Sequence, residues 1–183
     1  MLRERFSPRA FDGEPLAPGT LRQLLEAARW SASCFNEQPW RFIVAPRQDE
    51  EAFGAMLACL MEGNRPWAQH AGALLITVAR SSFTHNGKDN RHAWHDVGLA
   101  VGALTVQTQA LGLWLHQMAG FDAQAARDTY QIPEGFDAVT AIAIGKQGEL
   151  SVLSESLQQR EQAARTRRSQ SELVFSGSWG QAA

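Results

Sequence analysis

The sequence predicts an α+β fold, in which a mixed β-sheet is flanked by helices and a long buried helix lies near the centre. Segments with strand periodicity alternate with segments of helical periodicity along the chain. The connections vary in length and include one turn at 132–136, which disfavours a regular doubly wound sheet. Small and apolar residues recur through 91–110, which is typical of a helix that packs closely against its neighbours.

The bulk composition is that of one globular domain, expected to span 1–183. The chain has 183 residues, 44% of them hydrophobic and 20% charged, which excludes a disordered protein. A formal net charge of -2 gives no general attraction to nucleic acid or to an anionic membrane. The N-terminus carries charges instead of the apolar core of a signal peptide, and the two cysteines form no CxxC pair. These features predict a cytoplasmic protein without nucleic-acid or membrane partners.

The first half of the chain predicts two helices and two strands. Pro18 and Gly19 open a helix that runs to about Arg29, with Thr20 and Gln23 at capping-box spacing. A strand is expected at 40–44, and a second helix at 49–61 that Gly63 and Pro66 stop. The continuous apolar run at 71–79 is typical of a central strand covered on both faces.

The second half begins with a polar loop at 81–90 and the long helix at 91–110. A short strand at 111–116, a helix at 123–130 with Asp122 as its N-cap, and a buried strand at 138–145 follow. A short helix is expected near 155–163. Leu173, Phe175 and Trp179 are too apolar for a free tail, so we expect a C-terminal extension that docks on a surface.

The stretch from Trp30 to Trp40 combines polar and aromatic side chains. Ser33, Asn36 and Gln38 offer hydroxyl and amide groups between large rings, an arrangement that suits a flat heteroaromatic ligand. The alternative interpretation is a helix C-cap followed by a loop that the tryptophans pin in place.

Two basic clusters lie at opposite ends of the chain. Arg3, Arg5 and Arg9 surround Ser7, and the second cluster consists of Arg165, Arg167 and Arg168. Guanidinium groups match phosphate oxygens, so both clusters together predict one phosphate site. No G-x-G-x-x-G follows a strand and no Walker loop is present. With the Trp30–Trp40 stretch, the clusters predict a phosphorylated flat heterocycle such as flavin mononucleotide (FMN).

Three other patterns give weaker signals. His92, His95 and Asp96 could ligate a metal, but without a further matched motif an exposed helix face is favoured, and no metal is predicted. Cys34 could be a nucleophile, although a small packed residue is favoured. The residues at 176–180 do not fit the G-x-S-x-G elbow.

The segment Arg5-Phe-Ser-Pro-Arg9-Ala-Phe11 is similar to an R-x-S-x-R/K-x-F/Y opening, and 31–40 is similar to an S-P-S-S-x-N-x-Q-P-W signature. Asn64 with Trp67, the 110–122 stretch and the basic tail at 165–168 continue the similarity over nearly the whole chain. In these motifs the sequence resembles the FMN-dependent nitroreductase family.

The resemblance implies a role for each matching position. Arg5, Ser7, Arg165 and Arg167 would contact the FMN phosphate and ribityl chain, and Arg9 would stabilise the reduced flavin at its N1/O2 edge. The loop at 32–36 would come largely from a partner subunit, Asn64 would bind the pyrimidine edge, and 117–120 would cross the other ring face. The remaining cofactor-binding residues implied are Phe6, Ala32, Ser33, Cys34, Asn36, Gln117, Met118, Ala119 and Gly120.

The resemblance also implies an activity: an FMN-dependent NAD(P)H oxidoreductase. It would reduce nitroaromatics, quinones or similar small acceptors by a ping-pong hydride transfer through flavin N5, without a catalytic side chain. The enzyme would be a homodimer with its FMN sites at the interface and the arm at 165–183 packed on the partner. The alternatives are a specialised flavin enzyme, such as a dehalogenase or an enoate-type reductase, and a non-catalytic FMN-binding or sensing protein.

Several departures from the family pattern bear on the site, and Ala32 and Cys34 stand where proline and serine are common. Trp67 stands where some members have a lysine near O2, and Ala119 stands where some have a glutamate beside N5. The segment 81–92 is short where larger members insert helices, which implies a smaller lid.

Overall fold

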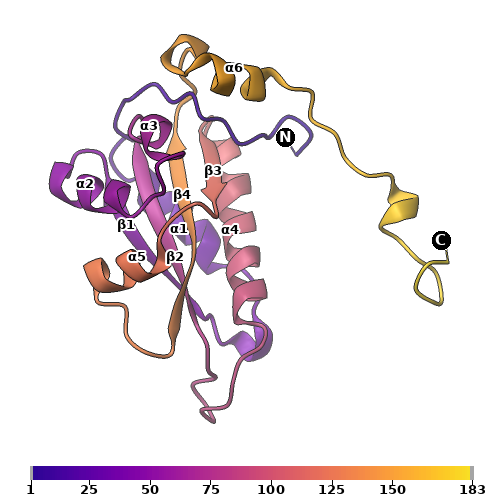
Figure 1. Cartoon of the computed structure of the whole chain (residues 1–183). Helices are drawn as coiled ribbons and strands as arrows, with labels where there is room; N and C mark the ends of the chain where they lie inside the picture. Colours follow the sequence, from indigo (N-terminus) through magenta and orange to yellow (C-terminus); the bar gives the residue numbers. More distant parts are fainter. Residues whose placement is uncertain (1, 182–183) are drawn as a thin grey trace.

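A computed structural model describes residues 2–181, and its centre is a four-stranded sheet with the strand order β1-β2-β4-β3 (Figure 1). The strands are β1 (Trp40–Pro46), β2 (Ala73–Arg80), β3 (Trp114–Met118) and β4 (Phe136–Gly145). The helices are α1 (Thr20–Arg29), α2 (Glu50–Ala58), α3 (Arg65–Ala68), α4 (Ala93–Ala110), α5 (Ala123–Tyr130) and α6 (Glu155–Gln162). The predicted α+β class is confirmed.

The described sheet is antiparallel throughout, so the expectation of mixed strand directions is wrong for these four strands. β2 and β3 run the same way, but β4 inserts between them and is antiparallel to both. In the same manner β2 separates β1 from β4. The crossover through α4 therefore never places two parallel strands side by side.

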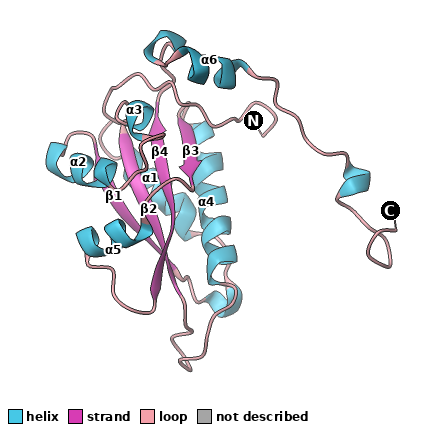
Figure 2. Cartoon of the chain, viewed as in Figure 1, coloured by secondary structure: helices cyan, strands magenta, loops and turns pink. Residues whose placement is uncertain are grey.

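Helices cover both faces of the sheet (Figure 2). On one face α1 and α4 pack against alternate residues of β2, such as Leu75. On the other face α2, α3 and α5 enclose a second cluster that contains Leu74 and Ile76. All of β2 except Arg80 is buried, which confirms the predicted central strand covered on both faces.

Only one face of α4 is buried in the chain. Val97, Val101 and Leu104 are at most 1% exposed and face the sheet and α1. Leu99 and Val106 lie on the opposite face and are each 43% exposed. The prediction of a buried helix is thus correct for one face, whereas the apolar side chains on the other stay largely exposed within the described chain. Within residues 2–181 no helix is long and apolar enough to cross a membrane.

Local signals at the helix ends gave mixed results. Asp122 caps α5 as predicted and accepts hydrogen bonds from the amides of Gln124 and Ala125, both at 2.9 Å. The capping box expected from Thr20 and Gln23 is wrong, because Thr20 is already helical and Gly19, with φ 81°, is the N-cap. α2 ends at Ala58, before the predicted 61, and the short α3 was not predicted.

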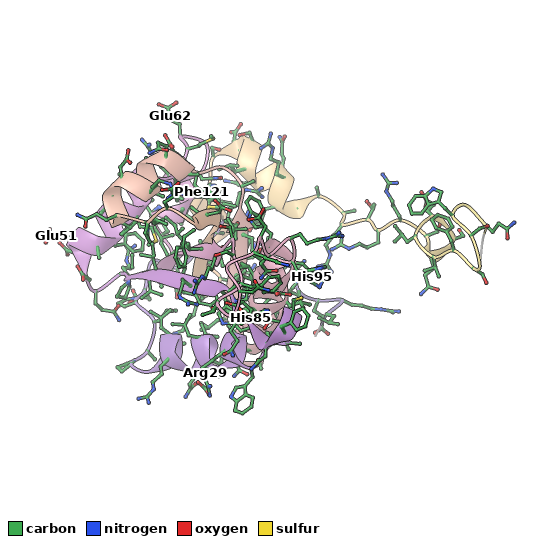
Figure 3. The ribbon with its side chains drawn as sticks, turned by 90° about the horizontal axis from the view of Figure 1, so that it is seen from below. Arg29, Glu51, Glu62, His85, His95 and Phe121 are labelled. Atoms are coloured by element: carbon green, nitrogen blue, oxygen red, sulfur yellow. The ribbon has the colours of Figure 1, made fainter. Side chains whose placement is uncertain are left out.

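The residues after α6 leave the body of the protein, and we call 163–181 the C-terminal arm (Figures 1 and 3). Its rings pack on each other, with the centroids of Phe175 and Trp179 4.9 Å apart. Leu173 is 62% exposed and Trp179 91%. The arm therefore makes no docking contact through these residues within its own chain. Residues 1 and 182–183 of the predicted domain and arm lie outside the described residues.

Candidate functional site

Arginines from the two ends of the chain meet at residues 3–12, which we call the N-terminal segment. Burial lowers the pKa of Arg5, and the positive charges of Arg165 and Arg167 lower it further. Arg165 donates a hydrogen bond to the Arg3 carbonyl, and Arg5 Nη1 donates to Ser7 Oγ at 3.3 Å. Clustered cations repel one another, so a bound anion would stabilise them. The structure thus brings together Arg3 and Arg5 of the first predicted cluster with Arg165 and Arg167 of the second.

A cleft of about 480 Å³ lies between the N-terminal segment and the end of α6. Its lining residues are Glu4, Phe6, Ser7, Arg9, Arg160, Glu161, Ala163, Ala164 and Arg165. The ring of Phe6 packs on Trp114 of β3 with centroids 4.5 Å apart, which fixes this wall of the cleft to the sheet. The guanidinium and hydroxyl groups on the wall are the donors that phosphate oxygens accept from most strongly.

Arg9 is held by a buried carboxylate on α6. The amides of Arg9 and Ala10 donate to Glu161 Oε1 at 2.8 and 3.4 Å, and Arg9 Nη1 lies 3.7 Å from Oε2. The Glu161 side chain is only 4% exposed, and its Oε2 has no hydrogen-bond partner. α6 thereby fixes the main chain that carries Arg9.

A second support comes from His116 of β3. Its Nδ1–H donates to the Pro8 carbonyl at 2.9 Å, and its ring packs on Trp67 at 4.6 Å. Burial lowers the pKa of His116 to about 4, and the charges of Arg9 and Arg5 lower it as well. The hydrogen bond to Pro8 acts in the opposite direction and raises it. His116 is therefore a neutral donor at physiological pH. Trp67 stands where some members of the family have a lysine near O2. It is 1% exposed, so it is a core residue and does not reach the surface of the cleft.

Asn64 and Gly120 form the next part of the site. Asn64 Nδ2 donates to the Gly120 carbonyl at 2.8 Å, and a Cβ at Gly120 would lie 2.6 Å from that nitrogen. A side chain at position 120 would therefore push the Asn64 amide away from this position. Along the stretch before it, Met118 is buried in the core, whereas Gln117 and Ala119 are exposed. Met118 can thus offer a ligand its main chain but not its side chain.

The loop that carries Ala32–Asn36 lines a separate hollow of about 270 Å³ beside the start of α4. The Cys34 amide donates to Asp96 Oδ2 at 3.0 Å, and Ser33 Oγ accepts from the Gln38 amide at 2.9 Å. Asn36 adopts φ 55° and points its exposed side chain outward. Asp96 is used as a hydrogen-bond acceptor here, and among the described residues no three His, Cys, Asp or Glu side chains gather closely enough to hold a metal ion.

The cleft at the N-terminal segment and the hollow at the Ala32–Asn36 loop are two separate groups of predicted site residues in one chain. No residue lines both the cleft at the N-terminal segment and the hollow at Ala32–Asn36. The hollow lies at the start of α4, whereas Trp114, which contacts the cleft, follows its end (Figure 1). At 1.5 Å per residue the two groups are on the order of 20 Å apart along the helix.

Two supporting residues escaped the sequence analysis. Glu161 lies 152 positions from Arg9 in a polar helix that contains one other carboxylate, and nothing local distinguishes it. His116 did leave a signal, because it is a polar residue at the end of a largely apolar run predicted to be a short strand. A buried histidine needs a hydrogen-bond partner, and that requirement could have marked it.

Comparison with known proteins assigns the family. Residues 2–146 match the family model described as Nitroreductase family. The chain belongs to the nitroreductase family. The match ends before α6, so Glu161 and the arm arginines lie beyond it.

Relatives and solved structures agree with this assignment. The chain is 30% identical over 150 residues to an uncharacterized 15.4 kDa protein of Mycolicibacterium smegmatis, covering 76% of this chain and 97% of that protein. It is 29% identical to an NADH dehydrogenase of Thermus thermophilus, covering 80% and 84%. The crystal structure of an oxidoreductase containing FMN matches with a TM-score of 0.92 and 35% identity, over 97% of this chain and 90% of that one.

The neutral His116 predicts how the stability of this nitroreductase-family chain depends on pH. Its pKa is about 4 when folded against 6.5 for an ordinary histidine, so between these values the unfolded chain binds the proton and stability is lost as pH falls. His116→Asn removes this titration and keeps an N–H for Pro8. Between about pH 7.5 and about pH 4.5 the unsubstituted protein should lose on the order of 2 kcal/mol more unfolding free energy than the variant, measured by urea denaturation. Equal losses in the two proteins would show that His116 is not buried in the neutral form.

Proposed function

We propose that this protein is an FMN-dependent oxidoreductase that takes hydride from NADH or NADPH and reduces a small acceptor such as a nitroaromatic or a quinone. The observation that carries the proposal is the convergence of Arg5, Arg165 and Arg167 beside Ser7. The matched oxidoreductase containing FMN supports the choice of cofactor, and the Thermus thermophilus NADH dehydrogenase supports the choice of donor.

The residues of the cleft fit the phosphate of FMN. A phosphate near pH 7 carries between one and two negative charges. Here it would offset both the burial of the Arg5 charge and its repulsion by Arg165 and Arg167, which together lower the pKa of Arg5. Ser7 Oγ and the guanidinium groups supply donors on one wall. Such a site needs no glycine-rich loop.

The other parts of the site fit the ring system and the ribityl chain. Arg9 would place a positive charge at the N1/O2 edge, and Asn64, oriented by the Gly120 carbonyl, would bind the pyrimidine edge. The main chain at 117–120 would cross one ring face, with a backbone amide toward N5. Bound FMN would supply the hydride chemistry, so the protein's groups bind, orient and stabilise charge, and no side chain has to exchange a proton.

The function also requires a second copy of the chain. The Ala32–Asn36 wall lies at the far end of α4 from the arginines, so we propose that the partner subunit supplies it. The exposed apolar residues Leu99 and Val106 on α4 provide a face for that contact. The C-terminal arm, with Leu173 and Trp179 exposed, would pack on the partner and complete the single domain of each subunit.

The proposed function predicts a yellow protein whose colour bleaches with a nicotinamide donor. The purified protein should release FMN on denaturation, identified by chromatography, and the bound chromophore should lose its visible absorption when NADH or NADPH is added without oxygen. A colourless protein that takes up no added FMN would contradict the proposal. Bound FMN that neither donor bleaches would instead support a non-catalytic FMN-binding protein.

Arg9 and Arg167 are expected to have separable roles. Arg167→Ala removes a phosphate contact and should weaken FMN binding by roughly 10- to 100-fold, the usual cost of a charge-assisted hydrogen bond. Arg9→Ala should slow anaerobic reduction of bound FMN more than it weakens retention. FMN dissociation constants and stopped-flow reduction rates measure the two effects, with Arg22→Ala, an exposed arginine on α1, as the charge control. Equal loss of FMN in both variants would contradict this division.

A further inference from the structure

The one buried carboxylate of the cleft wall, Glu161, faces Arg9 without occupying its donors. Oε1 accepts the amides of Arg9 and Ala10 at 2.8 and 3.4 Å. Oε2 is buried, has no hydrogen-bond partner and lies 3.7 Å from Arg9 Nη1. That distance is too long for a hydrogen bond but short for a charge interaction. The N–H groups on Nη1 are therefore available to a ligand in the cleft.

A purely structural role would not need a charge at this position. A glutamine oxygen could accept the same two amide hydrogen bonds, and burying an ionised oxygen without a hydrogen bond is costly. The Arg9 guanidinium is 26% exposed and Glu161 only 4%, so the charge pair sits at the edge of the cleft with its negative member on the inner side. The arrangement makes Glu161 a partial counterion for Arg9.

We propose that Glu161 is a positioning residue that fixes Arg9 in the FMN site and, through its charge, lowers the reduction potential of the bound flavin. This inference rests on the proposed function, in which Arg9 lies at the N1/O2 edge. That edge gains negative charge when FMN is reduced, so a positive Arg9 favours the reduced form. Glu161 cancels part of that charge and thereby shifts the balance toward the oxidised form.

Removing the charge of Glu161 should raise the reduction potential of the bound flavin. Glu161→Gln keeps an oxygen for the amides of Arg9 and Ala10 but removes the negative charge. FMN in its two-electron-reduced form should then bind about tenfold more tightly relative to oxidised FMN, which raises the midpoint potential by about 30 mV. Glu161→Asp retains the charge and should stay closer to the unsubstituted protein.

The experiment is a redox titration of the FMN-loaded full chain with reference dyes. Glu155→Gln is the matched control, because it removes the same charge from the exposed first turn of α6, roughly 9 Å along the helix from Glu161. It should leave the potential unchanged. The second comparison adds Glu161→Gln to a protein that already carries Arg9→Gln. Because Glu161 acts through Arg9, the ratio of the affinities for reduced and oxidised FMN should then change by less than about threefold, which corresponds to about 15 mV in midpoint potential.

The possible outcomes separate this inference from the function on which it rests. An upward shift in Glu161→Gln that is lost without Arg9 supports the inference. An unchanged potential in FMN-loaded Glu161→Gln, or a shift equally large without Arg9, overturns it and leaves the proposed function standing. An unsubstituted protein that binds no FMN overturns both. Should Glu161→Ala lose the fold of the N-terminal segment, Glu161→Gln still gives the answer, since it preserves both amide contacts.

Discussion

The candidate site depends on how the rest of the protein holds a stretch of main chain that forms no helix or extended strand. The N-terminal segment carries Arg5, Ser7 and Arg9, and its backbone groups need partners from elsewhere. Glu161 accepts two of its amides, and His116 donates to the Pro8 carbonyl. Farther along, Phe11 forms an isolated bridge with Gln147, just after β4. The sheet and α6 thus contact the segment from two sides, and these contacts fix the positions of its arginines.

The division of the site between the two ends of α4 constrains its function just as strongly. One chain places the cleft with its arginines and the hollow at the Ala32–Asn36 loop at opposite ends of the rigid helix α4. The exposed face of α4 and the apolar C-terminal arm are surfaces that a partner subunit would cover. In the proposed dimer, pairing through the exposed face of α4 also brings each Ala32–Asn36 loop to the partner's arginines. Dimerisation therefore explains both the divided site and the exposed apolar surfaces.

The sequence could predict what local pattern and composition determine. The apolar run of β2, the periodicity of α4 and the cap at Asp122 each followed from neighbouring residues, and the arginine clusters followed from charge. Antiparallel pairing throughout the sheet depends on which strand inserts between which, and no local signal carries that. Glu161 was missed for the same reason, since its partner lies 152 positions away. Arg9 was found without its counterion because only folding joins them.

Complementation between two variants tests most directly whether the site is shared by two subunits. Arg167→Ala impairs the arginine side, and Asn36→Gly removes the loop side chain while tolerating the φ of 55° found there. Each variant alone should retain little FMN. After subunit exchange in an equal mixture, about a quarter of all sites should be intact, because half of the dimers are hybrids with one unaltered site each. FMN retention that rises to that level is the predicted result. A mixture that retains no more FMN than its two components would contradict a site built from two subunits.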